Sequence, residues 1–285
     1  MMLPPPPELE HKHLERVTFE TDVGVVEAFR PAGAPYQCGD PNAPAILLVP
    51  GMGMDAVNFL CQLPLGAAGH LHLFENRTVA AAGEQGIAAF ARYVEAYIQA
   101  SKLDQHPGGL ILGGASMGGA MSLAVAIRGR IKLRGLVLIG TFGSTRRMRL
   151  WRRMLMAAIY FYSPWATRNI AKPILLHSGL FGRFSPREAA LLTPTPRFDY
   201  RYYVSAMNAL RRMNQIEAAR RLNIPTLVLH GTRDIVLPID TGRELAESIP
   251  GARLVPVDGG NHMFFLSHHD AVNGAIAEFV GGLRG

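Results

Sequence analysis

The chain has 285 residues, of which 48% are hydrophobic, with a mean hydropathy of +0.12 and a net charge of +7. This length suffices for one large core with an inserted subdomain. No apolar run reaches the roughly 18 residues that a membrane-spanning helix needs, and Cys38 and Cys61 lack metal-ligand spacing. We therefore expect no transmembrane segment, no disulfide framework and no metal site.

The N-terminus gives little sign of a targeting signal. Met1-Met2-Leu3 is followed by four prolines, without a basic region that leads into an apolar one. We expect residues 1–13 to form a disordered lead-in and the protein to reside in the cytoplasm.

Strand and helix patterns alternate along most of the chain. The segment Leu14–Arg30 alternates apolar and polar residues, which predicts an antiparallel hairpin at one edge of a sheet. The strands expected after it are Ala45–Val49, His70–Glu75, Gly109–Gly113, Arg134–Gly140, Ile224–His230 and Arg253–Val257. The helices expected between and after them are Glu84–Ala100, Ser116–Arg128, Asp240–Ile249 and Asp270–Leu283. This alternation predicts an α/β fold with a doubly wound, mostly parallel sheet and helices on both faces.

The segment from residue 142 to 222 differs from the rest in charge and periodicity. It carries fifteen Lys and Arg against three Asp and Glu, a net charge of +12, whereas the remainder has a net charge of −5. Apolar residues recur there at helical spacing in two sets, namely Met148, Trp151, Leu155, Ile159 and Tyr162, and Tyr200, Tyr203, Val204, Met207 and Leu210. We expect a helical lid over 142–222, inserted into a core made of residues 14–141 and 223–285.

A serine stands at a sharp predicted strand-to-helix turn. Gly114-x-Ser116-x-Gly118 follows a buried strand and precedes a helix. Such a turn presents a serine hydroxyl to substrate, and glycines flank it because a Cβ there would clash. A close-packed glycine-rich turn without catalysis is the alternative. The pattern makes Ser116 a candidate nucleophile, with Gly114 and Gly118 forming its elbow.

A serine nucleophile needs a base and a carboxylate. Among ten histidines, His262 lies just past the last predicted strand, where parallel strands deliver ligand-facing loops. Asp234 follows the buried strand before it and is the expected acid. Asp240 and Asp258 are its rivals: we expect Asp240 to cap the next helix and Asp258 to steady the loop of His262.

An acyl-transfer site also needs donors for a developing oxyanion. The expected donors are the backbone N–H groups of Met117, directly after the nucleophile, and of Met52, in the loop after Ala45–Val49. The methionine side chains would line an apolar acyl pocket. Expected substrate contacts are Gly51, Trp151 and Leu155.

The order Ser116, Asp234, His262, each after a strand, resembles the α/β-hydrolase superfamily over about residues 14–283. The resemblance implies a catalytic triad of these residues and an oxyanion hole at Met52 and Met117. Two departures are visible. Pro50-Gly51 replaces the commoner His-Gly, which removes a side chain that steadies the loop, and Phe74-Glu75-Asn76-Arg77 replaces a commoner Asp-x-x-Gly turn.

The predicted activity is hydrolysis of carboxylic esters through an acyl-enzyme, with an apolar acyl group and without a cofactor. Serine at 116 argues against the branches that use an aspartate nucleophile. Lactone hydrolysis also stays open, and C–C bond hydrolysis and cofactor-free perhydrolysis are rarer options. Two further alternatives are a thioesterase and an esterase for carrier-linked acyl esters, whose basic lid would bind an acyl-carrier protein, CoA or an anionic membrane surface. A non-catalytic binding protein is the alternative of another class. A nucleic-acid partner is not expected, and no Lys-Ser/Thr pair follows the glycine cluster, which disfavours a nucleotide-binding loop.

Overall fold

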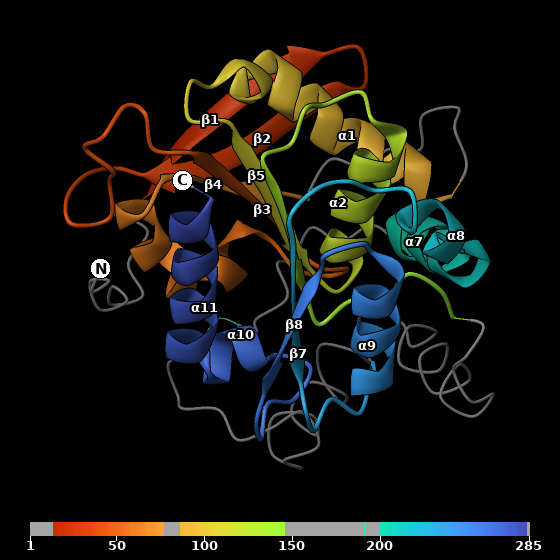
Figure 1. Cartoon of the computed structure of the whole chain (residues 1–285). Coiled ribbons are helices and arrows are strands. Elements are labelled where there is room, and N and C mark those ends of the chain that lie inside the picture. Colours follow the sequence, from red (N-terminus) through yellow and green to blue (C-terminus); the bar gives the residue numbers. More distant parts are fainter. Residues whose placement is uncertain (1–13, 77–85, 146–190, 192–199, 284–285) are drawn as a thin grey trace.

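The fold was analysed in a computed structural model, which describes residues 14–76, 86–145, 191 and 200–283 (Figure 1). The predicted lead-in, residues 1–13, lies outside the described residues. So does most of the predicted lid, of which residues 142–145, 191 and 200–222 are described.

One eight-stranded sheet organises the chain, in the order β1-β2-β4-β3-β5-β6-β7-β8. β1 pairs antiparallel with β2, and β2 with β4, while all other neighbours are parallel. The strands are β1 (Leu14–Thr21), β2 (Gly24–Pro31), β3 (Ala45–Val49), β4 (His70–Glu75), β5 (Leu110–Ala115), β6 (Gly135–Ile139), β7 (Thr226–Gly231) and β8 (Arg253–Val257). The predicted edge hairpin and the mostly parallel, doubly wound sheet are confirmed.

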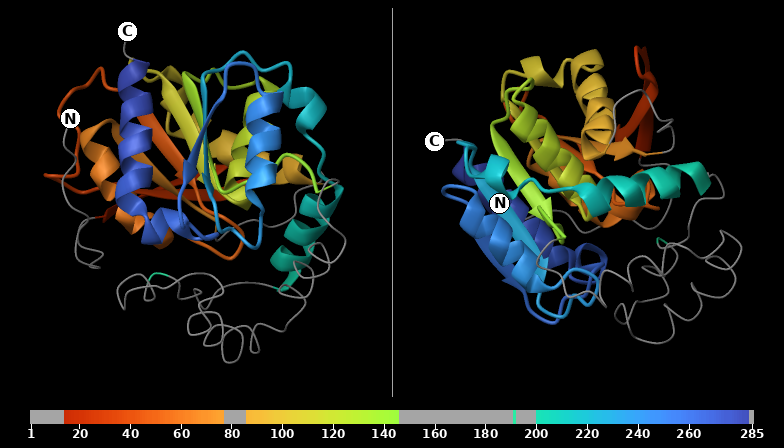
Figure 2. Two further views of the ribbon diagram at one scale, coloured as in Figure 1. Left: turned by 60° about the horizontal axis from the view of Figure 1, so that its bottom comes forward. Right: turned by 90° about the vertical axis from the view of Figure 1, so that its right-hand side faces the viewer.

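Helices cover both faces of this sheet (Figure 2). The helical elements are η2 (Ala56–Ala67), α1 (Ile87–Ala100), η3 (Leu103–Gln105), α2 (Met117–Arg128), α7 (Tyr200–Arg212), α8 (Ile216–Ala219), α9 (Ile239–Ser248), α10 (Phe264–Ser267) and α11 (His269–Gly282). Apolar residues of α1, α2, α7, α8 and α9 pack in one core, and those of η2, α10 and α11 in the other. Successive residues of β3 alternate between these two cores, which explains why a strand with no polar position is stable here.

Two elements depart from the expected pattern. Of the predicted apolar face of α7, Leu210 is buried and Met207 packs against the core, but Val204 is 39% exposed. The helix also buries Tyr202, Ala206 and Ala209, which the prediction did not include. The ring of Tyr202 lies 6.0 Å from that of Phe90 on α1. The side of α7 that faces α1 is therefore the buried side, and it includes two alanines. The long 3-10 segment η2, kinked at Phe59 and containing Pro64, has no counterpart among the predicted helices.

The segment between β6 and β7 leaves and rejoins the core at one place, which we call the neck. Ser144 and Asn214 form an isolated antiparallel bridge, and the Gln215 N–H donates to the Gly143 carbonyl at 2.8 Å. The side-chain amide of Gln215 donates to the Ala120 carbonyl of α2 at 3.1 Å. The two ends of the segment are therefore tied to each other and to the core.

Within the part of the chain that the structure describes, no helix is both long and apolar enough to span a membrane.

A buried histidine makes the fold sensitive to acid. His72 on β4 shares a 2.7 Å hydrogen bond with Tyr97 on α1, and burial, reinforced by Arg30, His70 and His106, lowers its pKa to about 4. The unfolded chain therefore binds a proton more readily than the folded chain below pH 6.5, so acid lowers the free energy of unfolding. We expect this group to contribute about 2 kcal/mol to the loss of stability between pH 7 and pH 5.

The variant His72→Gln tests this expectation, because glutamine can keep a hydrogen bond to Tyr97 but does not titrate. Urea unfolding of wild type and variant at pH 7 and pH 5 should show a smaller loss of stability on acidification in the variant. An equal loss in both proteins would place the acid sensitivity elsewhere, for example at the buried His230, whose pKa burial also lowers.

Candidate active site

Ser116 lies between β5 and α2, at the carboxyl end of the parallel strands. Its backbone has φ 52° and ψ −118°, a conformation that L-residues rarely adopt, and its side chain remains partly exposed. Its N–H donates to the Ile139 carbonyl at 2.9 Å, and the Thr141 hydroxyl donates to its carbonyl at 2.6 Å. Both sides of the turn are thus held by β6 and the residues after it.

The elbow glycines are required by close packing. A Cβ at Gly118 would lie 2.0 Å from the Val49 carbonyl oxygen, and one at Gly114 would lie 2.4 Å from the backbone of Gly118. Backbone atoms cannot move away as a flexible side chain could. The absence of side chains at these positions lets α2 begin against the end of β3.

An unbroken hydrogen-bond chain leads from Ser116 to a buried carboxylate. His262 Nε2 lies 3.1 Å from Ser116 Oγ, and His262 Nδ1 lies 2.7 Å from Asp234 Oδ2. The Asp234 side chain is fully buried, and that of His262 is 10% exposed. The carboxylate can only accept, so His262 carries its proton on Nδ1 and leaves Nε2 free to accept from the serine hydroxyl.

The carboxylate of Asp234 is held on both of its oxygens. Its Oδ1 accepts from the N–H groups of Val236 at 2.9 Å and Leu237 at 2.8 Å. The buried His230 donates from Nε2 to the Leu237 carbonyl at 2.8 Å, and the same nitrogen lies 3.7 Å from Asp234 Oδ2. Burial lowers the pKa of His230, so this imidazole is neutral beside the carboxylate. The turn after β7 thereby fixes which oxygen faces His262.

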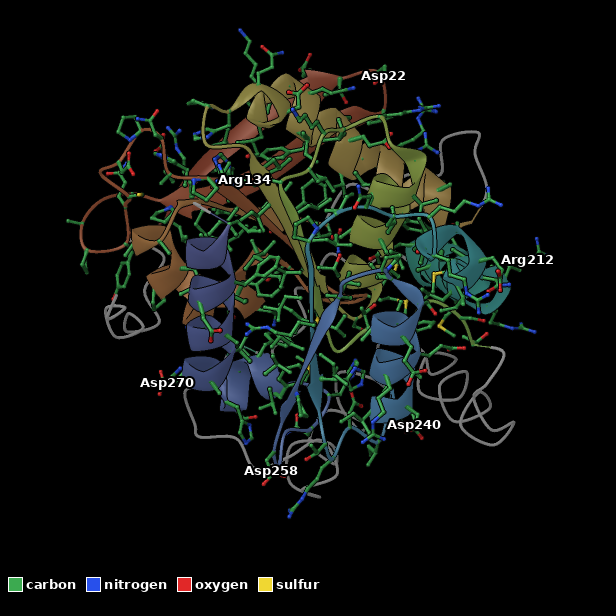
Figure 3. All side chains as sticks on the ribbon, in the orientation of Figure 1. Asp22, Arg134, Arg212, Asp240, Asp258 and Asp270 are labelled. Carbon is green, nitrogen blue, oxygen red and sulfur yellow. The ribbon has the colours of Figure 1, made fainter. Side chains whose placement is uncertain are left out.

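The two rival aspartates are exposed and bond to other partners, Arg243 and Thr232, and Figure 3 shows Asp240 on α9 and Asp258 in the loop after β8. Asp258 accepts from the Thr232 hydroxyl at 3.2 Å, which braces the loop after β8 against the loop after β7. Asp240 was expected to cap the next helix, and this expectation is wrong. Pro238 is the N-cap of α9, and Asp240 in its first turn pairs with Arg243 at 2.8 Å. The proline holds the extended backbone of the cap position, so the aspartate falls inside the helix.

The loop after β3 lies against the serine. A Cβ built at Gly51 would lie 3.2 Å from the Cβ of Ser116, so Gly51 and the nucleophile are in contact. Met52, the next residue, is 9% exposed, and Met117 is fully buried at the first position of α2. The first N–H groups of a helix have no intrahelical acceptor, and the helix dipole makes that end positive. The site therefore combines a serine hydroxyl with a helix N-terminus suited to a developing negative charge.

Two supporting side chains are absent from the expected site residues. Thr141 follows β6 and holds the carbonyl of Ser116, and Asn76 follows β4 and holds the loop after β3. In the sequence each is a polar residue in the loop after a buried strand, the same signal that selects Asp234. A position after a strand places the side chain at the edge of the sheet that carries the candidate site. It does not indicate which residue the side chain contacts.

The expected substrate contacts are described only in part. Gly51 lies beside Ser116 as noted, whereas Trp151 and Leu155 lie outside the described residues. Among the residues that the structure describes, no three His, Cys, Asp or Glu side chains are grouped so as to hold a metal ion.

Comparison with known proteins agrees with this architecture. Residues 46–275 match the model of the alpha/beta hydrolase family. The chain is 30% identical over 184 residues to the pimeloyl-[acyl-carrier protein] methyl ester esterase of Neisseria meningitidis serogroup B, covering 60% of this chain and 69% of that protein. It is 36% identical over 75 residues to the enzyme of the same name from Chromobacterium violaceum, covering 26% of this chain and 30% of that protein.

Solved structures share the fold. A hydrolase from Pseudomonas aeruginosa superposes with a TM-score of 0.74 at 22% identity, covering 94% of this chain and 98% of that chain. A thermophilic esterase from Thermogutta terrifontis superposes with a TM-score of 0.72 at 20% identity, covering 94% and 99%. Because the family model spans most of the sheet and all three residues of the hydrogen-bond chain, the protein belongs to the alpha/beta hydrolase family.

Proposed function

We propose that the protein hydrolyses carboxylic esters through an acyl-enzyme on Ser116. The observation that carries this proposal is the hydrogen-bond chain Asp234–His262–Ser116, with distances of 2.7 and 3.1 Å. A serine hydroxyl is activated by such a base, and a buried carboxylate orients the base. Two relatives are named as methyl ester esterases, and these names support the same reaction.

The proposed reaction proceeds in two halves. Ser116 Oγ attacks the ester carbonyl carbon while its proton moves to His262 Nε2, and the N–H groups of Met52 and Met117 bind the resulting oxyanion. Collapse expels the alcohol, which takes the proton from His262. Water then attacks the acyl-enzyme with its proton passing to the same nitrogen, and the acid is released as Ser116 recovers its hydrogen. Asp234 stays ionised and stabilises the imidazolium.

An apolar acyl group is proposed because the loop beside the nucleophile itself carries two methionines, Met52 and Met54. The sulfur of Met54 would lie 2.9 Å from a Cβ at Gly51, and Met52 is packed in the core next to it. Methionine adapts to irregular apolar ligands. We further propose that residues 142–222 act as a helical lid over this pocket and that Trp151 and Leu155 contact the acyl chain.

Labelling with a fluorophosphonate tests the reaction class. The probe should attach to Ser116, located by mass spectrometry of the digested protein, and the protein should hydrolyse p-nitrophenyl esters across a series of acyl lengths. A non-catalytic binding protein on the same fold would take up no label and would release no p-nitrophenol.

A carrier-linked acyl ester is the second candidate substrate. Two relatives are named as esterases of an acyl-carrier-protein ester, and this chain concentrates fifteen basic residues against three acidic ones in residues 142–222. In the described part, Arg211, Arg212 and Arg221 are exposed, and Figure 3 shows Arg212 at the outer side of α7. A positive surface raises the local concentration of an anionic partner such as a carrier protein. We propose the cytoplasm as the location, where the thiols of Cys38 and Cys61 would remain reduced.

Salt dependence separates the two candidates. For a carrier-linked ester, kcat/KM should fall about tenfold or more between roughly 50 and 500 mM salt, whereas a neutral p-nitrophenyl ester should hardly respond. Replacing Arg211, Arg212 and Arg221 with glutamine should lower kcat/KM for the carrier-linked ester at low salt. The matched control replaces Arg243 and Arg253, which are exposed and paired with Asp240 and Glu278 outside this segment. If kcat/KM responds equally to salt for both substrates, the data favour a neutral ester over a carrier-linked ester as the substrate class.

A further inference from the structure

A buried asparagine at the end of β4 contacts the loop that carries Met52. Asn76 is 2% exposed, and its amide nitrogen lies 2.8 Å from the Pro50 carbonyl oxygen and 3.3 Å from the Gly51 carbonyl oxygen. Both partners are acceptors, so the nitrogen of the amide, and not its oxygen, must face the loop. Asn76 therefore spans two successive peptide groups of one strand end.

These two peptide groups lie directly against the nucleophile. The Gly51 carbonyl also accepts from the Met54 N–H at 3.2 Å, which closes a tight turn around Met52. A Cβ at Gly51 would lie 3.2 Å from the Cβ of Ser116, and a Cβ at Gly118 would lie 2.5 Å from the Pro50 carbonyl oxygen. A small rotation of this loop would therefore displace Ser116 and the start of α2.

Peptide planarity links Asn76 to the proposed oxyanion donor. The carbonyl of Gly51 and the N–H of Met52 belong to the same planar trans unit and point in opposite directions. A donor that holds the Gly51 oxygen on one side fixes the direction of the Met52 N–H on the other. The hydrogen bond to the Pro50 carbonyl fixes the preceding plane in the same way, so the loop has little freedom to turn that N–H away.

We infer that Asn76 is a positioning residue, which aims the Met52 N–H at the oxyanion that forms on the acyl carbon beside Ser116. The inference rests on the proposed function. It also joins the two departures from the family pattern, because Pro50 has no side-chain donor to steady the loop, and Asn76, within the segment that departs at the end of β4, supplies one from the neighbouring strand.

The test compares Asn76→Asp with Asn273→Asp. Asn273 is 3% exposed and donates its amide to the Cys61 carbonyl at 2.7 Å, so it matches Asn76 in burial and bonding but lies on α11 and holds η2 instead of the loop. Each change replaces an N–H donor with a carboxylate facing a carbonyl. Both variants should lose thermal stability, and only the first should disturb the oxyanion donor.

The expected result is a selective loss of transition-state binding. Asn76→Asp should lower kcat for a p-nitrophenyl ester by about 10- to 100-fold with KM changed less than about threefold. A trifluoromethyl ketone inhibitor, whose adduct with Ser116 carries the oxyanion, should lose affinity by the same factor as kcat/KM. Asn273→Asp should keep both quantities within about threefold of wild type. If Asn76→Asp does not fold, Asn76→Ala takes its place in the test, because it removes the donor without adding a charge. It should show the same selective loss.

Three outcomes are distinguishable. Asn76 variants that match Asn273→Asp in kcat and in inhibitor affinity would overturn the positioning role while wild-type activity and labelling leave the proposed function intact. A loss confined to KM would also overturn it, since the donor would then act on ground-state binding. A wild-type protein that neither hydrolyses esters nor takes up fluorophosphonate would overturn the proposed function and this inference together.

Discussion

Replacing Ser116 with alanine is expected to lower kcat/KM for p-nitrophenyl esters by about 10⁴- to 10⁶-fold. Only the Oγ atom is lost, and that atom both attacks the carbonyl and accepts the acyl group. Alanine keeps the Cβ and so occupies the same backbone conformation, at φ 52°, with the same strain. Thermal unfolding should therefore stay close to that of wild type while activity disappears.

Assays of p-nitrophenyl ester hydrolysis and labelling with a fluorophosphonate check this expectation together. The variant should take up no fluorophosphonate, and circular dichroism should give the wild-type spectrum and a similar melting temperature. Retention of more than about a tenth of the activity in a contaminant-free preparation would remove Ser116 from the mechanism.

Replacing Asp234 with asparagine is expected to lower kcat by about 10³- to 10⁴-fold, and the structure indicates why. The Oδ1 atom already accepts from the N–H groups of Val236 and Leu237, so an amide at this position must turn its oxygen toward them. Its nitrogen then faces His262 Nδ1 and donates to it. The proton of the imidazole moves to Nε2, the nitrogen that must accept from Ser116, and the base is blocked.

Asp258→Asn is the matched control for this change. Asp258 accepts from the Thr232 hydroxyl in an exposed position, so its loss should loosen the loop after β8 and change kcat less than about threefold. Steady-state kinetics of both variants at one pH decide between the carboxylates. A larger loss for Asp258→Asn than for Asp234→Asn would reverse the assignment of the acid.

Strands of the parallel part of the sheet and the loops that follow them were the features best predicted from the sequence. Ala45–Val49, His70–Glu75 and Arg253–Val257 have the predicted bounds. The first is a continuous buried apolar block, whereas the second alternates polar and apolar residues and only Val257 of the third is buried. The order Ser116, Asp234, His262 identified three loops that the parallel sheet then brings to one edge. That step needs only strand direction, which the alternation of strands and helices supplies.

Features that depend on a distant partner were not predictable. The buried side of α7 faces Phe90 of α1, so Leu210 of the predicted set is buried whereas Val204 is exposed, and Ala206 and Ala209 are buried although the prediction left them out. Nothing in the sequence around Asn76 indicates that its side chain contacts Pro50, which lies 26 residues earlier in the chain. Supporting contacts of this kind follow from strand order and register, and these become known only when the sheet is assembled.

The neck between β6 and β7 has a consequence for how the segment that it closes can change in evolution. Its two ends, at Ser144 and Asn214, are already paired, so the entropy of bringing them together depends only weakly on what lies between, about 0.6 kcal/mol for each doubling of length. Chimeras that exchange residues 146–190 with those of a relative, and keep α7 with its buried residues, should therefore retain the sheet and the hydrogen-bond chain of Asp234, His262 and Ser116. During evolution this segment could therefore change in length, charge or sequence while the hydrogen-bond chain in the core stays the same.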